Sequence, residues 1–242
     1  MKRLLIRDAA LGHTSIEGSR LHYVTHVLRL GIGAKIEIFD GLGKTFDGVI
    51  ESVDSDRCQI RLTNERNESL GRAIEVIQGL PKGDKIDLIL QKGTELGVRR
   101  FLPVTCERSV VQISGKEESR RQRWQRIVEE AARQCGRSDL PQIALPGTLE
   151  SAIGDLPPHR QILVLDEEER SLSLSEGIAC APDKSCPVIL VVGPEGGLSR
   201  KEVAMLKNAG ALSVTLGRLI LRTETAALAA VTVLRHLEGR LG

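Results

Sequence analysis

Two loops near the carboxyl end of the sequence combine ionisable side chains with backbone that can approach a ligand closely. The first, residues 193–197, reads Gly-Pro-Glu-Gly-Gly and directly follows the apolar run 188–192. Its glycines permit positive φ and close approach, and Glu195 adds one carboxylate. A loop at the carboxyl end of a buried parallel strand is where open α/β sheets bind ligands. A plain strand-to-helix turn would show the same pattern, so both interpretations stay open.

The second loop, residues 216–226, follows another strand pattern and precedes a helix. Thr223 or Thr225 could cap that helix, and Glu224 would suit its positive end. Arg222 has no such explanation, because a cation at a helix N-terminus is unfavourable unless an anion or partner lies beside it. We therefore expect an anionic ligand group or a partner at Arg222.

Other familiar sites are not supported. Residues 41–45 end like a phosphate-binding P-loop but lack the upstream glycine, so we expect a hairpin turn there. His22 and His26 have the spacing of metal ligands on a helix, but no third ligand is near, which favours a partly buried helical turn. The five cysteines contain no C-x-x-C pair and predict reduced, mostly structural thiols. No metal site is predicted.

The hydrophobic pattern predicts the scaffold of these loops. A chain of 242 residues with 41% hydrophobic and 27% charged residues fits a small domain joined to a medium one. From about residue 4 to 62 the apolar residues alternate with period two, which predicts a β-rich module, and the polar residues 63–71 predict a linker. Beyond the linker, apolar runs alternate with helical segments, which predicts an α/β fold. We expect two domains, 1–70 and 71–242.

The expected elements of the second domain follow from periodicity and caps. A helix over about 117–135 places Trp124 and Val128 on one face and turns the arginines between positions 120 and 126 to solvent. The pair Ser199 and Glu202 forms a capping box that opens another helix. The remaining predictions are strands at 74–77, 101–104, 161–165, 188–192 and 213–216, and helices at 84–97 and about 224–237.

The two loops, within 191–199 and 216–226, resemble the cofactor-binding segments of the SPOUT methyltransferases. More closely they resemble the RsmE-type enzymes, which methylate N3 of a uridine in the 16S RNA of the small ribosomal subunit. The likeness covers nearly the whole chain, since it extends to residues 26–30, 91–98, 107–109 and 134–137. It implies an N-terminal PUA-like β-barrel domain for RNA and a C-terminal SPOUT domain with a trefoil knot, a rare exception to unthreaded chains.

The resemblance also implies a partner, a cofactor and an acceptor. The implied protein is a homodimer that binds S-adenosylmethionine and acts on 16S ribosomal RNA or the small subunit. The sequence shows no secretory signal and no apolar run of about 18 residues, so we expect a cytoplasmic protein without membrane contact.

Candidate roles follow from the family pattern and from the charge chemistry of the reaction. Arg222 or Arg29 would stabilise the negative charge that develops on the base, and Glu195 or Glu224 would take the proton or oppose the sulfonium charge. Phosphates of the RNA would meet Arg29, Lys92, Arg108, Arg137 and the arginines of 120–126, although that helix face could equally be a plain solvated surface. The expected cofactor-binding residues are Leu165, Gly193, Pro194, Glu195, Gly196, Leu216, Gly217, Ile220, Leu221, Thr225 and Ala226.

Two rival functions stay open. One is a SPOUT enzyme with another acceptor, such as a ribose 2′-hydroxyl. Against it, residues 222–226 read Arg-Thr-Glu-Thr-Ala, whereas the ribose-methylating SPOUT families are expected to carry an Asn-bearing Ser-Leu-Asn motif in this segment. The other is a non-catalytic RNA-binding or ribosome-assembly factor on the same fold, which would not need both loops intact.

Overall fold

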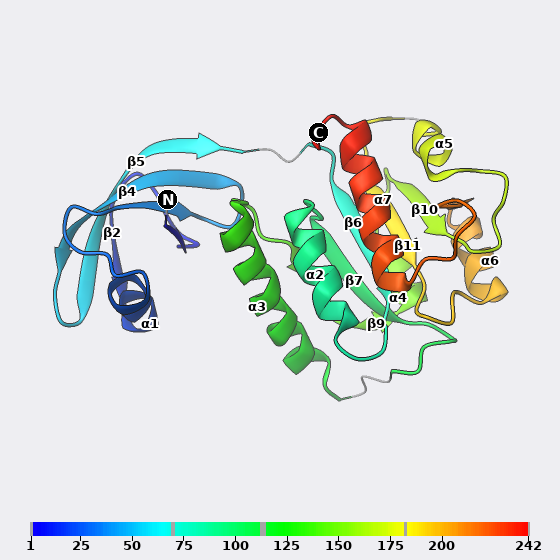
Figure 1. The fold of residues 1–242 in the computed structure, drawn as a ribbon, viewed down its shortest axis with the longest axis horizontal. Coiled ribbons are helices and arrows are strands. Elements are labelled where there is room, and N and C mark those ends of the chain that lie inside the picture. Colours follow the sequence, from blue (N-terminus) through cyan, green and yellow to red (C-terminus); the bar gives the residue numbers. More distant parts are fainter. Residues whose placement is uncertain (1, 69–70, 112–114, 182, 242) are drawn as a thin grey trace. The chain divides into compact units, whose positions relative to one another are not determined.

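The computed structural model of the chain describes residues 2–68, 71–111, 115–181 and 183–241 (Figure 1). Its contacts divide it into two units: unit 1 is Met1–Ser69 with Ala132–Leu140, and unit 2 is Leu70–Ala131 with Pro141–Gly242. The sequence pattern did not indicate that residues 132–140 belong with the N-terminal unit. None of the described helices is long and apolar enough to cross a membrane.

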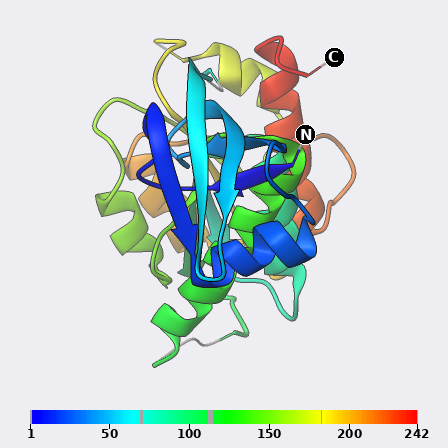
Figure 2. The same cartoon turned by 90° about the vertical axis from the view of Figure 1, so that its left-hand side faces the viewer.

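Unit 1 is a five-stranded sheet with strand order β1-β3-β4-β5-β2 and one short helical segment (Figure 2). Its alternating apolar residues form a separate core that includes Ile36, Ile38, Phe46 and Ile60. The turn between β3 and β4 is the expected hairpin at residues 40–43. The elements are β1 Arg3–Leu5, β2 Gly12–Glu17, α1 Gly18–His22, the π-helical turn η1 Tyr23–Val27, β3 Lys35–Phe39, β4 Lys44–Val53 and β5 Arg57–Asn67.

The predicted linker at residues 63–71 is wrong over 63–67, because β5 continues to Asn67 and pairs with β4. The polar side chains there face solvent, and ion pairs with neighbouring strands hold Arg66 in place. Arg66 lies 2.8 Å from Asp47 and 3.2 Å from Glu37. Over residues 64–67 the side chains on both faces of the strand are exposed, so neither face needs apolar residues and polarity alone misled the prediction. Residues 69 and 70 lie outside the described ranges.

Unit 2 contains a seven-stranded sheet in which the described strands pair in parallel, as the continuous apolar runs predicted. The strand order is β12-β10-β11-β6-β7-β8, with β9 paired to β7. The strands are β6 Ile74–Gly79, β7 Arg100–Thr105, β8 Gln142–Ile143, β9 Gly147–Thr148, β10 Gln161–Leu165, β11 Val188–Val192 and β12 Leu212–Val214.

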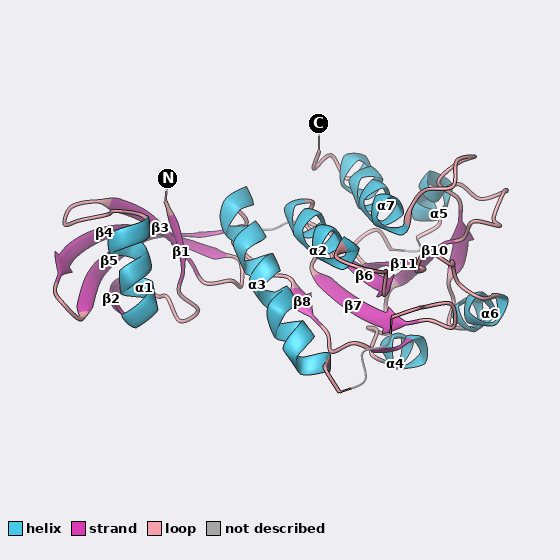
Figure 3. Ribbon diagram, turned by 60° about the horizontal axis from the view of Figure 1, so that its bottom comes forward, coloured by secondary structure: helices cyan, strands magenta, loops and turns pink. Residues whose placement is uncertain are grey.

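Helices cover both faces of this sheet (Figure 3). One core cluster joins one face to α2 Lys85–Glu95, α3 Glu117–Cys135, α5 Leu174–Ala179 and α7 Thr223–Leu237. A second cluster joins the other face to α4 Leu149–Gly154 and α6 Arg200–Asn208. The predicted capping box of α6 is present at Ser199 and Glu202. Three-layer packing of this kind is the α/β architecture that the alternation of elements predicted.

The final helix α7 buries one stripe within this chain. Its buried apolar residues are Ala227, Ala230, Val231 and Leu234, which share one face, while Leu228 and Val233 on the flanks are only half-buried. The described residues of this chain therefore cover only one side of α7.

Candidate active site

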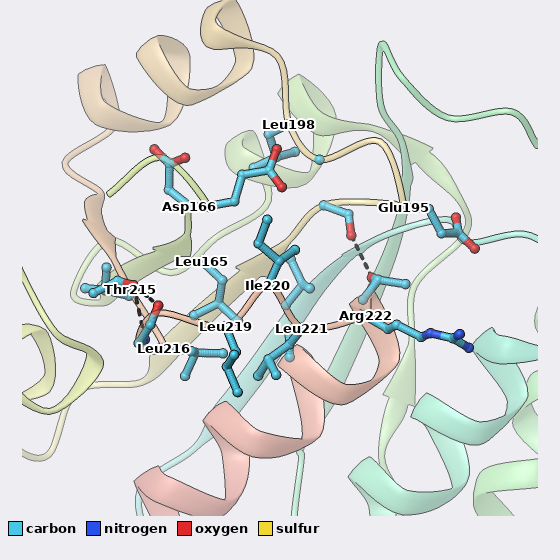
Figure 4. Close-up of a pocket in the computed structure, with 18 of the residues that line it drawn as sticks. Leu165, Asp166, Glu195, Leu198, Thr215, Leu216, Leu219, Ile220, Leu221 and Arg222 are labelled. Atoms are coloured by element: carbon cyan, nitrogen blue, oxygen red, sulfur yellow. Dashed lines mark hydrogen bonds between the residues drawn. The ribbon is translucent and has the colours of Figure 1, made fainter. Parts of the chain in front are cut away.

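A cavity of about 340 Å³ opens at the edge of the sheet where β10, β11 and β12 end. Their last residues, Leu165, Val192 and Val214, form its floor. The two glycine-containing loops form the walls, so the ligand position expected at the carboxyl ends of parallel strands is a real cavity (Figure 4).

One end of the cavity is apolar. Figure 4 shows Leu165, Leu216, Leu219, Ile220 and Leu221 gathered there. Leu219 and Ile220 are each 80% exposed, an unusual state for adjacent large aliphatic side chains, which a bound flat ring would cover. An apolar surface of this kind fits a nucleobase such as adenine.

A buried hydrogen-bond chain fixes the two loops to the sheet. The Thr223 hydroxyl donates to the Gly193 carbonyl at 2.6 Å and accepts from the Gln78 side chain at 2.9 Å. The same Gln78 amide donates to the Gly79 carbonyl at 2.8 Å. Gln78 and Thr223 were not predicted as site residues. The available signal was a glutamine directly after the apolar pair Val76 and Ile77.

Replacing Thr223 with valine is expected to lower the free energy of unfolding by about 1–3 kcal/mol, because buried partners on Gln78 and Gly193 lose their hydrogen bonds. Urea denaturation measures this effect. The matched control is Thr232→Val in the same helix, where the hydroxyl is exposed and bonds only within the helix to the Leu228 carbonyl. Equal losses in both variants would contradict the role assigned to Thr223.

The opposite end of the cavity is charged. The Lys85 ammonium lies 2.8 Å from Glu195 Oε1 and 3.6 Å from Glu224 Oε2. The backbone N–H of Lys82 also donates to Glu195, at 3.1 Å. Lys85 stands at the first position of α2, where the helix dipole disfavours a cation, so the two carboxylates compensate for that position. Sequence reasoning missed Lys85, although a lysine at a helix N-terminus was a usable signal.

These contacts set the protonation states. Burial raises the pKa of Glu195, but the hydrogen bonds from Lys85 and from the Lys82 backbone outweigh it and leave this pKa below its ordinary value. The hydrogen bond to Glu195 raises the pKa of Lys85. Glu195 is therefore a stable anion and Lys85 a stable cation at neutral pH.

Arg222 lines the same charged end, and its guanidinium lies on the side of the pocket away from Leu216 (Figure 4). It is exposed and is the N-cap residue of α7, without a side-chain capping bond. None of the ion pairs among the described residues involves Arg222. The anion that the sequence predicted for this cation is thus not a carboxylate of the described chain.

A second acidic group borders the cavity and was also missed. Asp166 is bound in a fork by Arg200, at 2.9 and 3.0 Å. Burial raises the pKa of Asp166, but the Arg200 hydrogen bonds and others outweigh this and leave it lowered. Glu167 follows, and a Cβ built on Gly197 would lie 2.9 Å from its Oε1. The signal was the acidic run 166–169 directly after the apolar strand β10.

Most of the predicted site residues meet at this cavity. Gly196 and Thr225 are not among its lining residues, and Glu224 reaches it through Lys85. Arg29 belongs to unit 1, so a catalytic role for it stays a prediction. The predicted residues that line the cavity are Leu165, Gly193, Pro194, Glu195, Leu216, Gly217, Ile220, Leu221, Arg222 and Ala226.

The predicted RNA-binding residues have different surroundings. Arg108 is exposed and donates to the Gly196 carbonyl at 3.0 Å, beside the pocket loop. Lys92 is partly exposed and paired with Glu95 at 2.9 Å. Arg137 is only 5% exposed, and its guanidinium donates two hydrogen bonds to the carboxylate of Asp139. This side chain is therefore not presented to a phosphate.

The arginines of α3 are partly engaged as well. Arg121 pairs with Glu118 at 2.7 Å, and Arg123 pairs with Asp87. Arg126 is exposed. Surface pairs of this kind contribute little stability and can be exchanged for phosphate contacts.

Comparison with protein families assigns a class to this fold and pocket. Residues 67–235 match the family described as RNA methyltransferase domain, and residues 16–63 match the RNA methyltransferase PUA domain. The fold and the pocket together define an RNA methyltransferase of the SPOUT type with a PUA-like N-terminal domain.

Individual relatives narrow this class. The Bacillus subtilis protein named ribosomal RNA small subunit methyltransferase E is 34% identical over 229 residues, which cover 92% of this chain and 89% of that protein. A Mycobacterium tuberculosis protein of the same name is 30% identical over 231 residues, 93% of this chain and 87% of that one. The chain belongs to the ribosomal RNA small subunit methyltransferase E family.

Solved structures agree with this assignment. The Neisseria gonorrhoeae ribosomal RNA small subunit methyltransferase E bound to S-adenosyl methionine has a TM-score of 0.86 and 30% identity, with 98% of each chain covered. A Legionella pneumophila protein with bound cofactor SAM has a TM-score of 0.81 and 28% identity, with 97% of each chain covered.

Proposed function

We propose that this chain transfers a methyl group from S-adenosylmethionine to N3 of a uridine in 16S ribosomal RNA. The observation that carries the proposal is the cavity formed by residues 193–197 and 216–223, with an apolar end and a charged end. The apolar end fits the adenine, and the backbone of both loops fits the polar parts of the cofactor. Membership of the methyltransferase E family supports the acceptor RNA.

When bound, S-adenosylmethionine supplies a methyl carbon that leaves its sulfur as the new N3–C bond forms, and S-adenosylhomocysteine remains. The chain's own task is to position the base and control its charge. Uridine N3 must lose its proton, and a fixed cation stabilises the resulting negative charge. Arg222 is the cation we assign to this role, because it lines the charged end and pairs with none of the described carboxylates.

The two carboxylates have different environments, and we propose different roles for them. Glu195 is held ionised by Lys85 and Lys82, so it is a poor proton acceptor and a good counter-charge for the sulfonium. Glu224 Oε2 is buried and accepts no hydrogen bond within the described chain, which favours Glu224 as the proton acceptor. Lys85 holds both groups in place.

Replacing Lys85 with methionine is expected to reduce kcat for methyl transfer by about 10- to 100-fold, because two adjacent carboxylates then lose their shared cation. Lys85→Arg should retain most of the activity. Lys184→Met, an exposed lysine outside the pocket lining, serves as the matched control. Full activity of Lys85→Met over the whole pH range would contradict the assignment.

Further properties are proposed on the strength of the family. We propose a homodimer with a trefoil-knotted second domain, a domain boundary at residues 70/71, and a cytoplasmic location, where small ribosomal subunits are assembled. Leu219 and Ile220 are exposed beside the pocket, and the part of this apolar surface that the cofactor leaves uncovered is a place for a second copy to pack. Arg29, Lys92 and Arg108 remain proposed RNA contacts, and Arg137 is left out of that surface because it is buried.

Incubation with labelled S-adenosylmethionine and small ribosomal subunits that lack the modification tests the function. Nucleoside analysis should place the label in 3-methyluridine. Label in a 2′-O-methyl nucleoside would overturn the acceptor and keep the class of enzyme. Absence of both labelling and cofactor binding by calorimetry would favour the assembly-factor function instead.

A further inference from the structure

The segment that follows β2 has an uncommon backbone. Helix α1 continues into the π-helical turn η1, in which the N–H of Leu28 donates to the Tyr23 carbonyl. The chain then leaves the helix through Arg29 at φ 55°, and the N–H of Leu30 closes the turn on the Val24 carbonyl. Glycine is the ordinary residue at such a left-handed position. Single π-helical turns and strained non-glycine residues concentrate at functional sites.

This turn carries a pair of stacked rings on the surface. The imidazoles of His22 and His26 have centroids 4.5 Å apart and an interplanar angle of 16°, and both residues are exposed. The large rings elsewhere are buried: Trp124 and Phe101 are each 1% exposed, and Phe39 and Phe46 are fully buried. For a chain with 2% aromatic residues, the described surface offers its stacked rings only at this turn.

The geometry argues against the metal site that the spacing of these histidines first suggested. Their rings lie face to face instead of converging on one point, and the Nδ1 atom of His26 is engaged by the Thr25 hydroxyl at 2.8 Å. No cluster of three or more metal-binding side chains occurs among the residues that the structure describes. The sequence predicted a partly buried helical turn here. Leu21 and Val24 are buried on one side of this segment, and both histidines lie on its exposed side.

A nucleobase fits this arrangement. Unpaired bases in RNA stack on aromatic side chains, histidine included, and such contacts tolerate different bases. Arg29 is exposed, follows His26 closely in the chain, and forms no ion pair among the described residues of unit 1. Its cation is therefore available to a phosphate of the same strand. The nearby Val27, 59% exposed, adds apolar surface that a base edge would cover.

We propose that His22 and His26 form a stacking platform for an unpaired base of the RNA substrate, with Arg29 binding the adjacent phosphate. This inference rests on the proposed function, because it names the surface of unit 1 that holds the RNA. Stacking contributes affinity that does not depend on the base sequence, while Arg29 contributes the salt-dependent part of RNA binding.

The test measures binding of the full chain to a fluorescent oligoadenylate of about ten nucleotides, a length within the range of single-strand sites. At pH 8.5, the double variant His22→Ala, His26→Ala should weaken binding about 10-fold or more, because the stacking contact with a base is lost. The salt dependence should stay unchanged. His26→Tyr in the presence of His22 should bind as wild type. His13→Ala, an exposed histidine on β2 of the same unit, is the matched control.

Two further readouts separate stacking from charge and from misfolding. An abasic oligonucleotide should bind the wild type and the double variant equally, because no base remains to stack. Arg29→Ala should reduce the slope of log Kd against log salt by about 0.7, the value for one phosphate of a single strand. Equal binding of the intact oligonucleotide by wild type and double variant would overturn the proposal, as would an equal loss with abasic RNA.

The proposal and the proposed function fail in different ways. A wild-type protein that methylates ribosomal RNA normally, together with a double variant that binds RNA equally well, refutes only the platform. A wild-type protein that binds the oligonucleotide through these histidines but transfers no methyl group refutes only the enzymatic function.

Discussion

Arg222→Ala is expected to reduce kcat/KM for methyl transfer by about 100- to 1,000-fold, the usual effect of removing one fixed group that stabilises a developing negative charge. Arg222 pairs with none of the described carboxylates, and it is exposed. Its removal should therefore leave the fold intact. Cofactor affinity should change much less than kcat, because the apolar end of the pocket is formed by other residues.

Two variants make this result specific. Arg222→Lys keeps the charge but loses the planar fork, so it should have intermediate activity. Arg61→Ala removes an exposed arginine of β5 that pairs with Glu51, and it should change kcat/KM by less than about twofold. Wild-type kcat in Arg222→Ala would show that another group, Arg29 included, stabilises the charge on the base.

Gly193→Ala is expected to abolish measurable cofactor binding at ordinary concentrations. A Cβ on Gly193 would lie 2.9 Å from the Gly197 carbonyl carbon and 2.9 Å from the Leu198 nitrogen, both backbone atoms. The 193–197 loop would have to move, and the hydrogen bond from Thr223 to Gly193 would move with it. Overpacking of this kind costs about 1–3 kcal/mol, and displacement of the loop removes the wall of the pocket as well.

Calorimetry with S-adenosylmethionine measures this effect, and urea denaturation reports the accompanying loss of stability. Gly154→Ala is the matched control: it lies at the end of α4 in the same unit, has no positive φ, and has no heavy atom within 4 Å of the added Cβ. Unchanged affinity in Gly193→Ala would mean that the loop does not bind the cofactor.

The pattern of the sequence by itself determined much of the second unit. Buried parallel strands must be apolar on both faces, so the runs at 161–165 and 188–192 were visible without a structure and have the predicted bounds. The capping box at Ser199 was equally local. The loops after these strands were found for the same reason, because strand ends are set by neighbouring residues in the chain.

Only the tertiary structure decided which charges meet. Lys85, Glu195 and Glu224 come from three elements, and Gln78 meets Thr223 across 145 positions of sequence. No periodicity encodes such pairs, because they depend on the order of strands in the sheet. The same holds for Arg137, whose basic character suggested RNA until burial beside Asp139 excluded it, and for residues 63–67, whose polarity concealed a strand. Local pattern fixes elements and loops, whereas solvent exposure and charge partners are properties of the packed chain.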